Sequence, residues 1–229
     1  MKHLLFVSLL ALTMVNIVIP SDAQTPALQQ GVSVQMPVTS NAQPMPAADN
    51  QDAMIIAVTA DGRLFFGIHP ESAEGLLEQM KSNPRRSDQN LYIKADAHAR
   101  FVDVKKTLMA AQAGEFATPV LLTMQREAPQ PGAVVLPKGI AVGLRARGNS
   151  DSIVVRISGS AQGSATLTVN DHVLPWSELE SALKQRVHSP DQIVQVEAND
   201  AVSFADLIRV LDEARATGAM VSIPIFHSL

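Results

Sequence analysis

The chain has 229 residues, a net charge of −4 and no cysteine. The lack of cysteine excludes disulfide bonds and thiolate chemistry, and the mild charge without a Lys/Arg stripe argues against nucleic-acid binding. Apolar residues make up 46% of the chain but aromatic residues only 4%, so the core must consist mainly of aliphatic side chains. The length suits one large domain or two small ones.

The N-terminus carries an export signal. Lys2 precedes an apolar stretch from Leu4 to Ile19, and small residues follow at 21–23. Residues 1–23 are therefore expected to be a signal peptide cleaved after Ala23. The alternative is an uncleaved anchor, although this stretch is shorter than the roughly 20 apolar residues that span a membrane. Either way, Lys2 is expected to keep the N-terminus inside, so that the rest of the chain lies outside the cytoplasm.

Residues 24–53 are rich in Gln, Pro, Ala and Ser and hold no charge before Asp49. This composition predicts a flexible linker. A tether between the membrane and a folded part, and a leader without a role, both fit it.

Residues 54–124 have the pattern of a small α/β unit. Two β-rich runs flank Asp61-Gly62, a dipeptide typical of a tight hairpin. Pro70 predicts the first turn of a helix, and alternation over residues 90–94 predicts a strand. Further along, apolar residues at helical spacing predict a second helix that ends at Gly114, and a last strand follows it. The predicted order is ββαβαβ.

Residues 152–229 show the same order again. Two strand-like runs come first, then a helix from about Pro175 to Arg186, a strand, a second helix and a final strand. Residues 125–151 between the units are expected to be a linker with an extra strand at Ile140–Leu144.

The two units align at an offset of 103 residues, without a gap, over 63–113 and 166–216. Twelve of these 51 positions are identical, against about 3 for random pairing. In the first unit they are Leu64, His69, Leu76, Lys81, Asp88, Gln89, Ala95, Phe101, Asp103, Leu108, Ala111 and Ala113. The chain therefore contains an internal duplication. We expect an α/β (α+β) fold with two tandem domains, each a small mixed sheet with two helices.

Both units resemble the periplasmic domain of the ExbD/TolR biopolymer-transport family. The signature is a strand ending in Ala-Asp, an aromatic residue after a short gap, and a helix that ends near Gly. Ala95-Asp96, Phe101 and Gly114 match it in the first unit. Ala198-Asn199, Phe204 and Gly218 match in the second, with Asn in place of Asp.

The resemblance implies a role in envelope transport. Members of this family sit in the inner membrane with a proton-channel partner of the ExbB/TolQ type and act on TonB/TolA-type proteins. Their channel chemistry uses an aspartate in the single membrane helix, where an ionisable group is costly and functional. Here Leu4–Ile19 contains no Asp or Glu, and its strongly polar residue, Asn16, cannot carry a proton.

Four residues are candidates for partner contacts or turns: Asp96, Asn199, His69 and His172. Asp96 and Asn199 follow a strand and precede a helix, where such side chains also form turns and helix starts. His69 and His172 occupy equivalent positions before the first helix of each unit, either as polar helix-entry residues or as protonation-sensitive contacts.

No cofactor or metal is expected, because no histidines pair at i, i+4 and none lies near Cys or Glu at ligand spacing. No nucleophile elbow or phosphate loop occurs, so the chain is not expected to be an enzyme. The leading hypothesis is a periplasmic ExbD/TolR-like accessory or scaffold protein, as an intrachain pseudo-dimer or a homodimer. The alternative is a peptidoglycan- or small-ligand-binding module.

Overall fold

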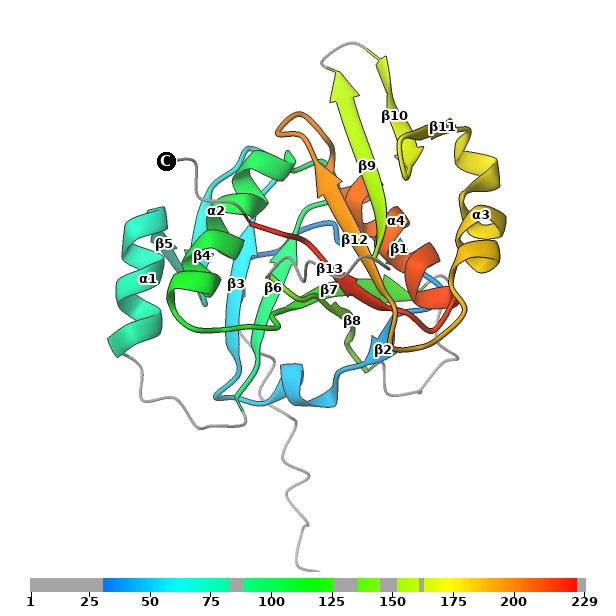
Figure 1. The fold of residues 1–229 in the computed structure, drawn as a ribbon. Helices are drawn as coiled ribbons and strands as arrows, with labels where there is room; N and C mark the ends of the chain where they lie inside the picture. The colour runs from blue at the N-terminus through cyan, green and yellow to red at the C-terminus, as the bar shows by residue number, and fades with distance from the viewer. Residues whose placement is uncertain (1–30, 83–88, 126–135, 145–151, 161–162, 226–229) are drawn as a thin grey trace, which may run out of the picture.

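The computed structural model describes residues 31–82, 89–125, 136–144, 152–160 and 163–225 (Figure 1). These residues form two mixed α/β units, which confirms the predicted fold class. The expected signal peptide lies outside the described residues. So do residues 24–30 of the expected N-terminal linker and much of the linker between the units.

The first unit is a mixed sheet with two helices. Its strands are ordered β5-β4-β3-β6-β7, with β3, β6 and β7 parallel and β4 and β5 antiparallel at one end. Helices connect the parallel strands, as such crossovers require. The bounds are β3 (Met54–Val58), β4 (Leu64–Phe66), β5 (His69–Glu71), α1 (Ala73–Ser82), β6 (Leu91–Ala95), α2 (Phe101–Ala113) and β7 (Val120–Gln125).

The second unit repeats this topology in the order β11-β10-β9-β12-β13. Its longer helix, α4 (Phe204–Ala216), has the length of α2 and starts 103 residues after it. The sequence offset is therefore also the structural offset, as a duplication requires. The other bounds are β9 (Ile153–Ser160), β10 (Gly163–Val169), β11 (His172–Leu174), η2 (Trp176–Glu178), α3 (Leu179–Arg186), β12 (Ile193–Ala198) and β13 (Met220–Ser222).

The prediction of a helix start at Pro70 is wrong. Pro70 lies in β5, a third hairpin strand, and α1 begins at Ala73. The turn into β5 has Gly67 at φ +62°, and its counterpart has Asn170 and Asp171 at +48° and +66°. Left-handed turn residues of this kind close two-residue hairpins. Each unit is therefore βββαβαβ, with strands too short for periodicity to reveal.

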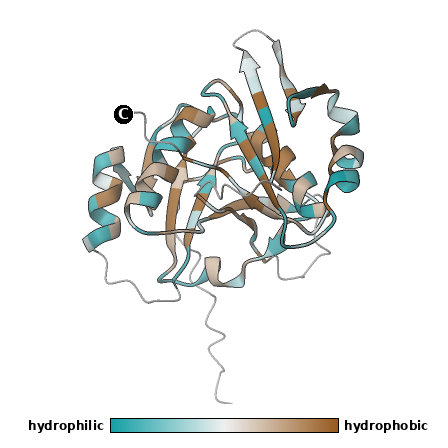
Figure 2. Ribbon diagram, viewed as in Figure 1, coloured by the Kyte–Doolittle hydropathy of each residue, from teal (hydrophilic) through white to brown (hydrophobic). Residues whose placement is uncertain are grey.

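The two faces of the central strands have different surroundings. Leu91 and Ile93 of β6 belong to the large core under the helices, whereas Tyr92 joins a small cluster on the opposite face. In β12, Val194 and Val196 face the core, and the polar residues Gln195 and Glu197 alternate with them. Figure 2 shows hydrophobic and hydrophilic residues alternating along α1 and α3, as expected for helices that cover one face of a sheet.

Residues 31–53 do not form the flexible linker expected from composition. They include β1 (Val38–Thr39), which pairs in parallel with the end of β7, β2 (Gln43–Pro44) and η1 (Pro46–Asp49). Thr39 and Thr123 share a buried hydroxyl hydrogen bond of 2.8 Å. Ala48 and its neighbours cover the apolar face around Tyr92. Burial of this face outweighs the bias of the composition toward disorder.

Asp212 of α4 fixes this N-terminal segment to the second unit. Its carboxylate accepts the backbone N–H of Ser40 at 2.9 Å and of Asn41 at 2.8 Å, and the Asn41 side chain donates to its carbonyl at 3.2 Å. Asp212 is only 9% exposed. The segment that packs on the first unit is therefore held by a buried charge from the second.

We expect Asp212→Ala to destabilise the chain by about 1–3 kcal/mol, because the backbone N–H groups of Ser40 and Asn41 lose a charged acceptor in partly buried hydrogen bonds. Urea unfolding measures the loss, and hydrogen exchange should accelerate at Ser40 and Asn41. The control is Glu213→Ala on the same helix. Burial, followed by the charges of Glu180 and Asp212, raises the pKa of Glu213, so removing its carboxyl should not destabilise. Equal stability of the two variants would contradict the role of Asp212.

Candidate interaction site at the junction of the repeats

The two units meet through the loops that follow their central strands. Arg100 and Ser203, which are equivalent at the 103-residue offset, form an antiparallel bridge. Four backbone hydrogen bonds surround it, in two pairs whose members are equivalent at the same offset. In the first pair, the N–H of Phe101 donates to Val202 at 2.7 Å, and the N–H of Phe204 donates to Ala99 at 2.8 Å. In the second pair, the N–H of Val102 donates to Asp200 at 3.3 Å, and the N–H of Ala205 donates to Ala97 at 3.0 Å. Each unit donates and accepts the same bonds. The contact is therefore isologous, like the interface of a two-fold dimer.

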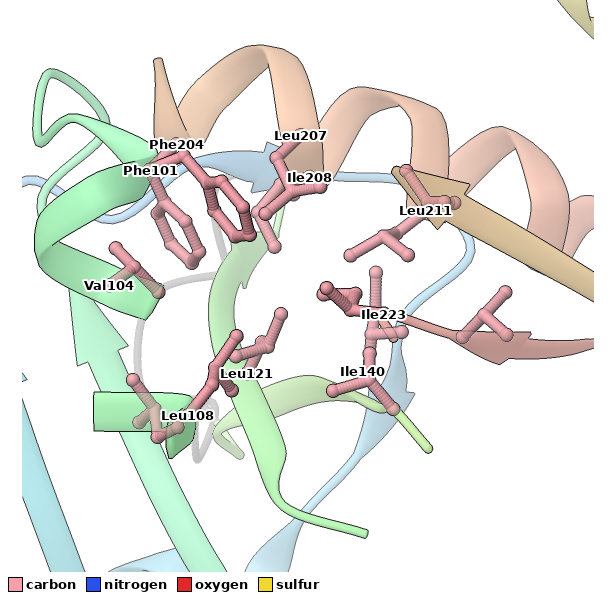
Figure 3. Packing of buried hydrophobic residues seen from close by; sticks show 14 of the residues in the cluster. Phe101, Val104, Leu108, Leu121, Ile140, Phe204, Leu207, Ile208, Leu211 and Ile223 are labelled. Carbon is pink, nitrogen blue, oxygen red and sulfur yellow. The ribbon is translucent and has the colours of Figure 1, made fainter. Parts of the chain in front are cut away.

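The side chains behind these loops form one core. Figure 3 shows residues of α2 and α4 pointing into a common cluster with Leu121, Ile140 and Ile223. Phe101 is 3% exposed and Phe204 is fully buried. The two phenylalanines begin α2 and α4, so the backbone bridge brings both rings to the junction. Both copies have phenylalanine at this position because each copy buries it at the junction.

A strand between the repeats joins their sheets. β8 (Lys138–Ala141) pairs antiparallel with β7, and Leu144 continues this side by donating to Ala117 at 3.2 Å. Gly143 faces the other way: it donates to Val221 at 3.0 Å and accepts from Ile223 at 2.8 Å. One strand thus covers the edges of both last strands. It overlaps the extra strand expected at Ile140–Leu144.

The structure places Asp96 and Asn199 in the two junction loops. The Asp96 carboxylate accepts the backbone N–H groups of Gln35 and His98, both at 2.9 Å, and contacts His98 Nδ1 at 3.1 Å. The Asn199 side chain instead exchanges two hydrogen bonds with the backbone of Gly159, at 3.0 and 3.1 Å. Both side chains therefore hold the backbone at the end of a central strand.

Opposing effects act on the Asp96 carboxyl. Burial alone would raise its pKa, but the hydrogen bonds from His98 and Gln35 outweigh burial and hold the pKa below its ordinary value of 3.8. The ionised form is the one that the native junction binds.

His69 and His172 lie far from this junction. They are exposed and belong to β5 and β11, the outermost strands at one end of each sheet. They do not enter the helices that follow them. The structure thus brings two of the four candidate residues together and leaves the other two on separate sheet edges.

Sequence reasoning missed Asp212. The signal was an acid next to the core residue Leu211, at a position where the first unit has Met109. Within the described ranges, no group of three or more His, Asp or Glu side chains is arranged to hold a metal ion.

Comparison with known families supports the architecture. The family model of the biopolymer transport protein ExbD/TolR matches residues 7–125 and again residues 119–225. The chain belongs to the ExbD/TolR family. Comparisons with curated proteins and with solved structures returned no match. The two family matches correspond to the two units, so this member carries the ExbD/TolR domain twice.

The family assignment gives the junction residues a context. The residues that carry the resemblance in the first unit bound the loop that contacts the second: Ala95 ends β6, Asp96 lies in the loop, and Phe101 begins α2. Over the described ranges of this ExbD/TolR chain, no helix has both the length and the hydropathy of a membrane span.

We predict that Phe101→Ala and Phe204→Ala each cost about 3–5 kcal/mol. Because both rings belong to the junction, the double variant should deviate from additivity by at least about 0.5 kcal/mol in urea unfolding. Leu179→Ala is the control, since Leu179 is fully buried in α3 away from the junction. Phe101→Ala and Leu179→Ala should be additive. Additivity in both pairs would show that the phenylalanines are not coupled.

We predict that Asp96→Asn removes about 1–3 kcal/mol of stability at pH 7, because a charged acceptor of two N–H groups is lost. The folded-state pKa of Asp96 lies below the unfolded value. Its contribution is therefore present above pH 3.8 and is lost as the pH falls through the folded pKa. Unfolding curves of the two proteins should converge in that acidic range. His98→Ala is the control and should have little effect, since that ring is mostly exposed. A constant difference at every pH would contradict the assignment.

Proposed function

We propose that this ExbD/TolR-family chain is a periplasmic accessory or scaffold protein of biopolymer transport that acts through protein contacts. The family assignment supports the field of action. The observation that carries the specific role is the reciprocal junction between two family domains in one chain. Family domains of this type work as dimers, and here a covalent link supplies the second copy. A short linker gives an effective concentration in the mM range, so the pair forms at any dilution.

In this proposal the chain itself has no membrane-helix aspartate for proton translocation. The apolar stretch Leu4–Ile19 holds no Asp or Glu. The first family match begins at residue 7 and so includes most of this stretch. A channel subunit needs an ionisable group in its membrane helix. We infer that proton translocation is left to an ExbB/TolQ-type partner or to another family member, and that this chain supplies the paired periplasmic domain.

The sheet edges at β5 and β11, which pair with no further strand among the described residues, are the proposed partner surface for a TonB/TolA-type protein. β5 and β11 lie at the ends of their sheets, next to Ile68, which is 48% exposed, and with Val173, which is 76% exposed. An exposed edge with an apolar side chain suits the addition of a strand from a partner. The edges of β7 and β13 are already covered by residues 138–144. His69 and His172 would flank such a partner strand.

The test is expression of the full chain followed by recovery from the periplasm. We expect a mature protein that begins at Gln24 by mass spectrometry, with the mass of one chain by light scattering. Small-angle scattering should show one compact particle, because the halves share a core. Recovery of a membrane-bound protein with Met1 intact would instead support the hypothesis of a membrane-anchored channel subunit. A homodimer with independent halves would contradict the pseudo-dimer.

Peptidoglycan binding is the second candidate. The face of the second sheet opposite its helices is polar: Arg156 bonds Glu197 at 2.8 Å, and Gln195 donates to Glu197 at 2.9 Å. Side chains of this kind donate and accept hydrogen bonds, which suits the hydroxyl and amide groups of a sugar polymer. Retention of the purified chain on peptidoglycan, with no protein partner present, would favour this function over the scaffold.

A further inference from the structure

A cavity of about 500 Å³ lies where the two repeats meet, beside the strand that joins their sheets. Leu144 lines it from the joining strand, and Ile193 and Val221 line it from the second unit. Its volume falls within the range of about 300–1,000 Å³ that is usual for small-molecule sites. Most of the lining is apolar, as in such sites. The cavity exists because residue 143 pairs with β13 while β8 continues along β7.

A buried hydroxyl without a partner lines this cavity. Ser222 is 4% exposed, and its Oγ makes no hydrogen bond in the structure. A buried polar atom in this state costs about 1–3 kcal/mol. The Oγ atom has almost no surface open to the cavity, so rotation of the Ser222 side chain is needed to present the hydroxyl to an oxygen atom of a ligand.

One cation also lines the cavity. The Arg215 guanidinium donates from Nη1 to the Ala219 carbonyl at 3.2 Å. In the described part of the chain, Arg215 forms no ion pair with a carboxylate, and no acidic residue lines the cavity. Its remaining N–H groups are therefore available to an anion, which a guanidinium binds best as a planar carboxylate.

The charge is specific to the second repeat. The residue equivalent to Arg215 in the first repeat is Gln112, whose side-chain amide donates to the Leu144 carbonyl at 3.3 Å. Gln112 therefore holds the joining strand, and its charged counterpart is left for a ligand. The junction is therefore not fully symmetric, because Arg215 gives the cavity one charged side chain in an otherwise mostly apolar lining.

We propose that this junction cavity binds a small aliphatic carboxylate. The apolar walls take the hydrocarbon, Arg215 pairs with the carboxylate, and Ser222 Oγ donates to one of its oxygens. Because the walls come from both repeats and from the joining strand, binding stabilises the packed arrangement of the two domains.

The experiment is calorimetric titration of the chain from Gln24 onward with decanoate below its micellar concentration. We expect saturable binding of one decanoate per chain. Decanol, which keeps the hydrocarbon and lacks the charge, should bind at least about tenfold more weakly. Arg215→Gln should weaken decanoate binding by about tenfold or more and should leave decanol binding unchanged. Ala141→Trp, at an exposed position of the cavity wall, should abolish both.

Two matched controls isolate the cavity. Arg186→Gln changes an arginine that also lies at a helix end and donates to a backbone carbonyl, at 2.8 Å, but does not line the cavity. Ser158→Trp places the same large side chain at an exposed position of the second sheet. Both should bind decanoate like the unchanged chain. Thermal melts of each variant establish that it is folded.

The proposal is overturned if decanoate does not bind saturably, or if decanol binds equally well. It also fails if Arg215→Gln and Ala141→Trp bind like their controls. A short apolar peptide with a free C-terminus is titrated in parallel. Binding of the peptide without binding of decanoate would reassign the cavity to a protein partner and would likewise end the small-ligand proposal.

Discussion

Everything in this chain depends on the reciprocal hydrogen bonding between residues 97–102 and 200–205. It aligns α2 with α4 and brings Phe101 and Phe204 into one buried cluster. A unit of about 75 residues buries too little surface to be robust alone. Two units that share a core gain the burial of a domain twice as long. The duplication is thus also a solution to marginal stability, in a chain without disulfides and with few aromatic side chains.

The segments outside the repeats contact the two units differently and so break this symmetry. The joining strand runs antiparallel to β7 and pairs in parallel with β13, so it cannot treat the two repeats alike. The N-terminal segment covers the outer face of the first sheet and is fixed by Asp212 of the second unit. The corresponding face of the second sheet remains polar. Partners therefore meet two different domains, although the domains arose as copies.

The contrast between the candidate residues shows where sequence reasoning succeeds. The sequence predicts Asp96 and Asn199 as turn or partner-contact residues after a strand, and in the structure both side chains bond to nearby backbone there. His69 and His172 precede a helix in the sequence, but they lie on the edge strands β5 and β11. The deciding feature was a left-handed turn at Gly67 and at Asn170, a backbone state that residue periodicity does not record. The linker prediction for residues 31–53 is wrong, because composition carries no information about the apolar sheet face that these residues cover.

The sequence by itself determined the duplication, the family, the order of the longer elements and the aliphatic character of the core. These follow from patterns of two and 3.6 residues and from matches at one fixed offset, all of which are local. Only the tertiary structure decided how the copies meet, which strand joins their sheets and where the cavity lies. Those features rest on hydrogen bonds such as Gln35 to Asp96 and Ser40 to Asp212, which join residues 61 and 172 positions apart. Such pairings leave no periodic trace, because each is a single contact made after the chain has folded.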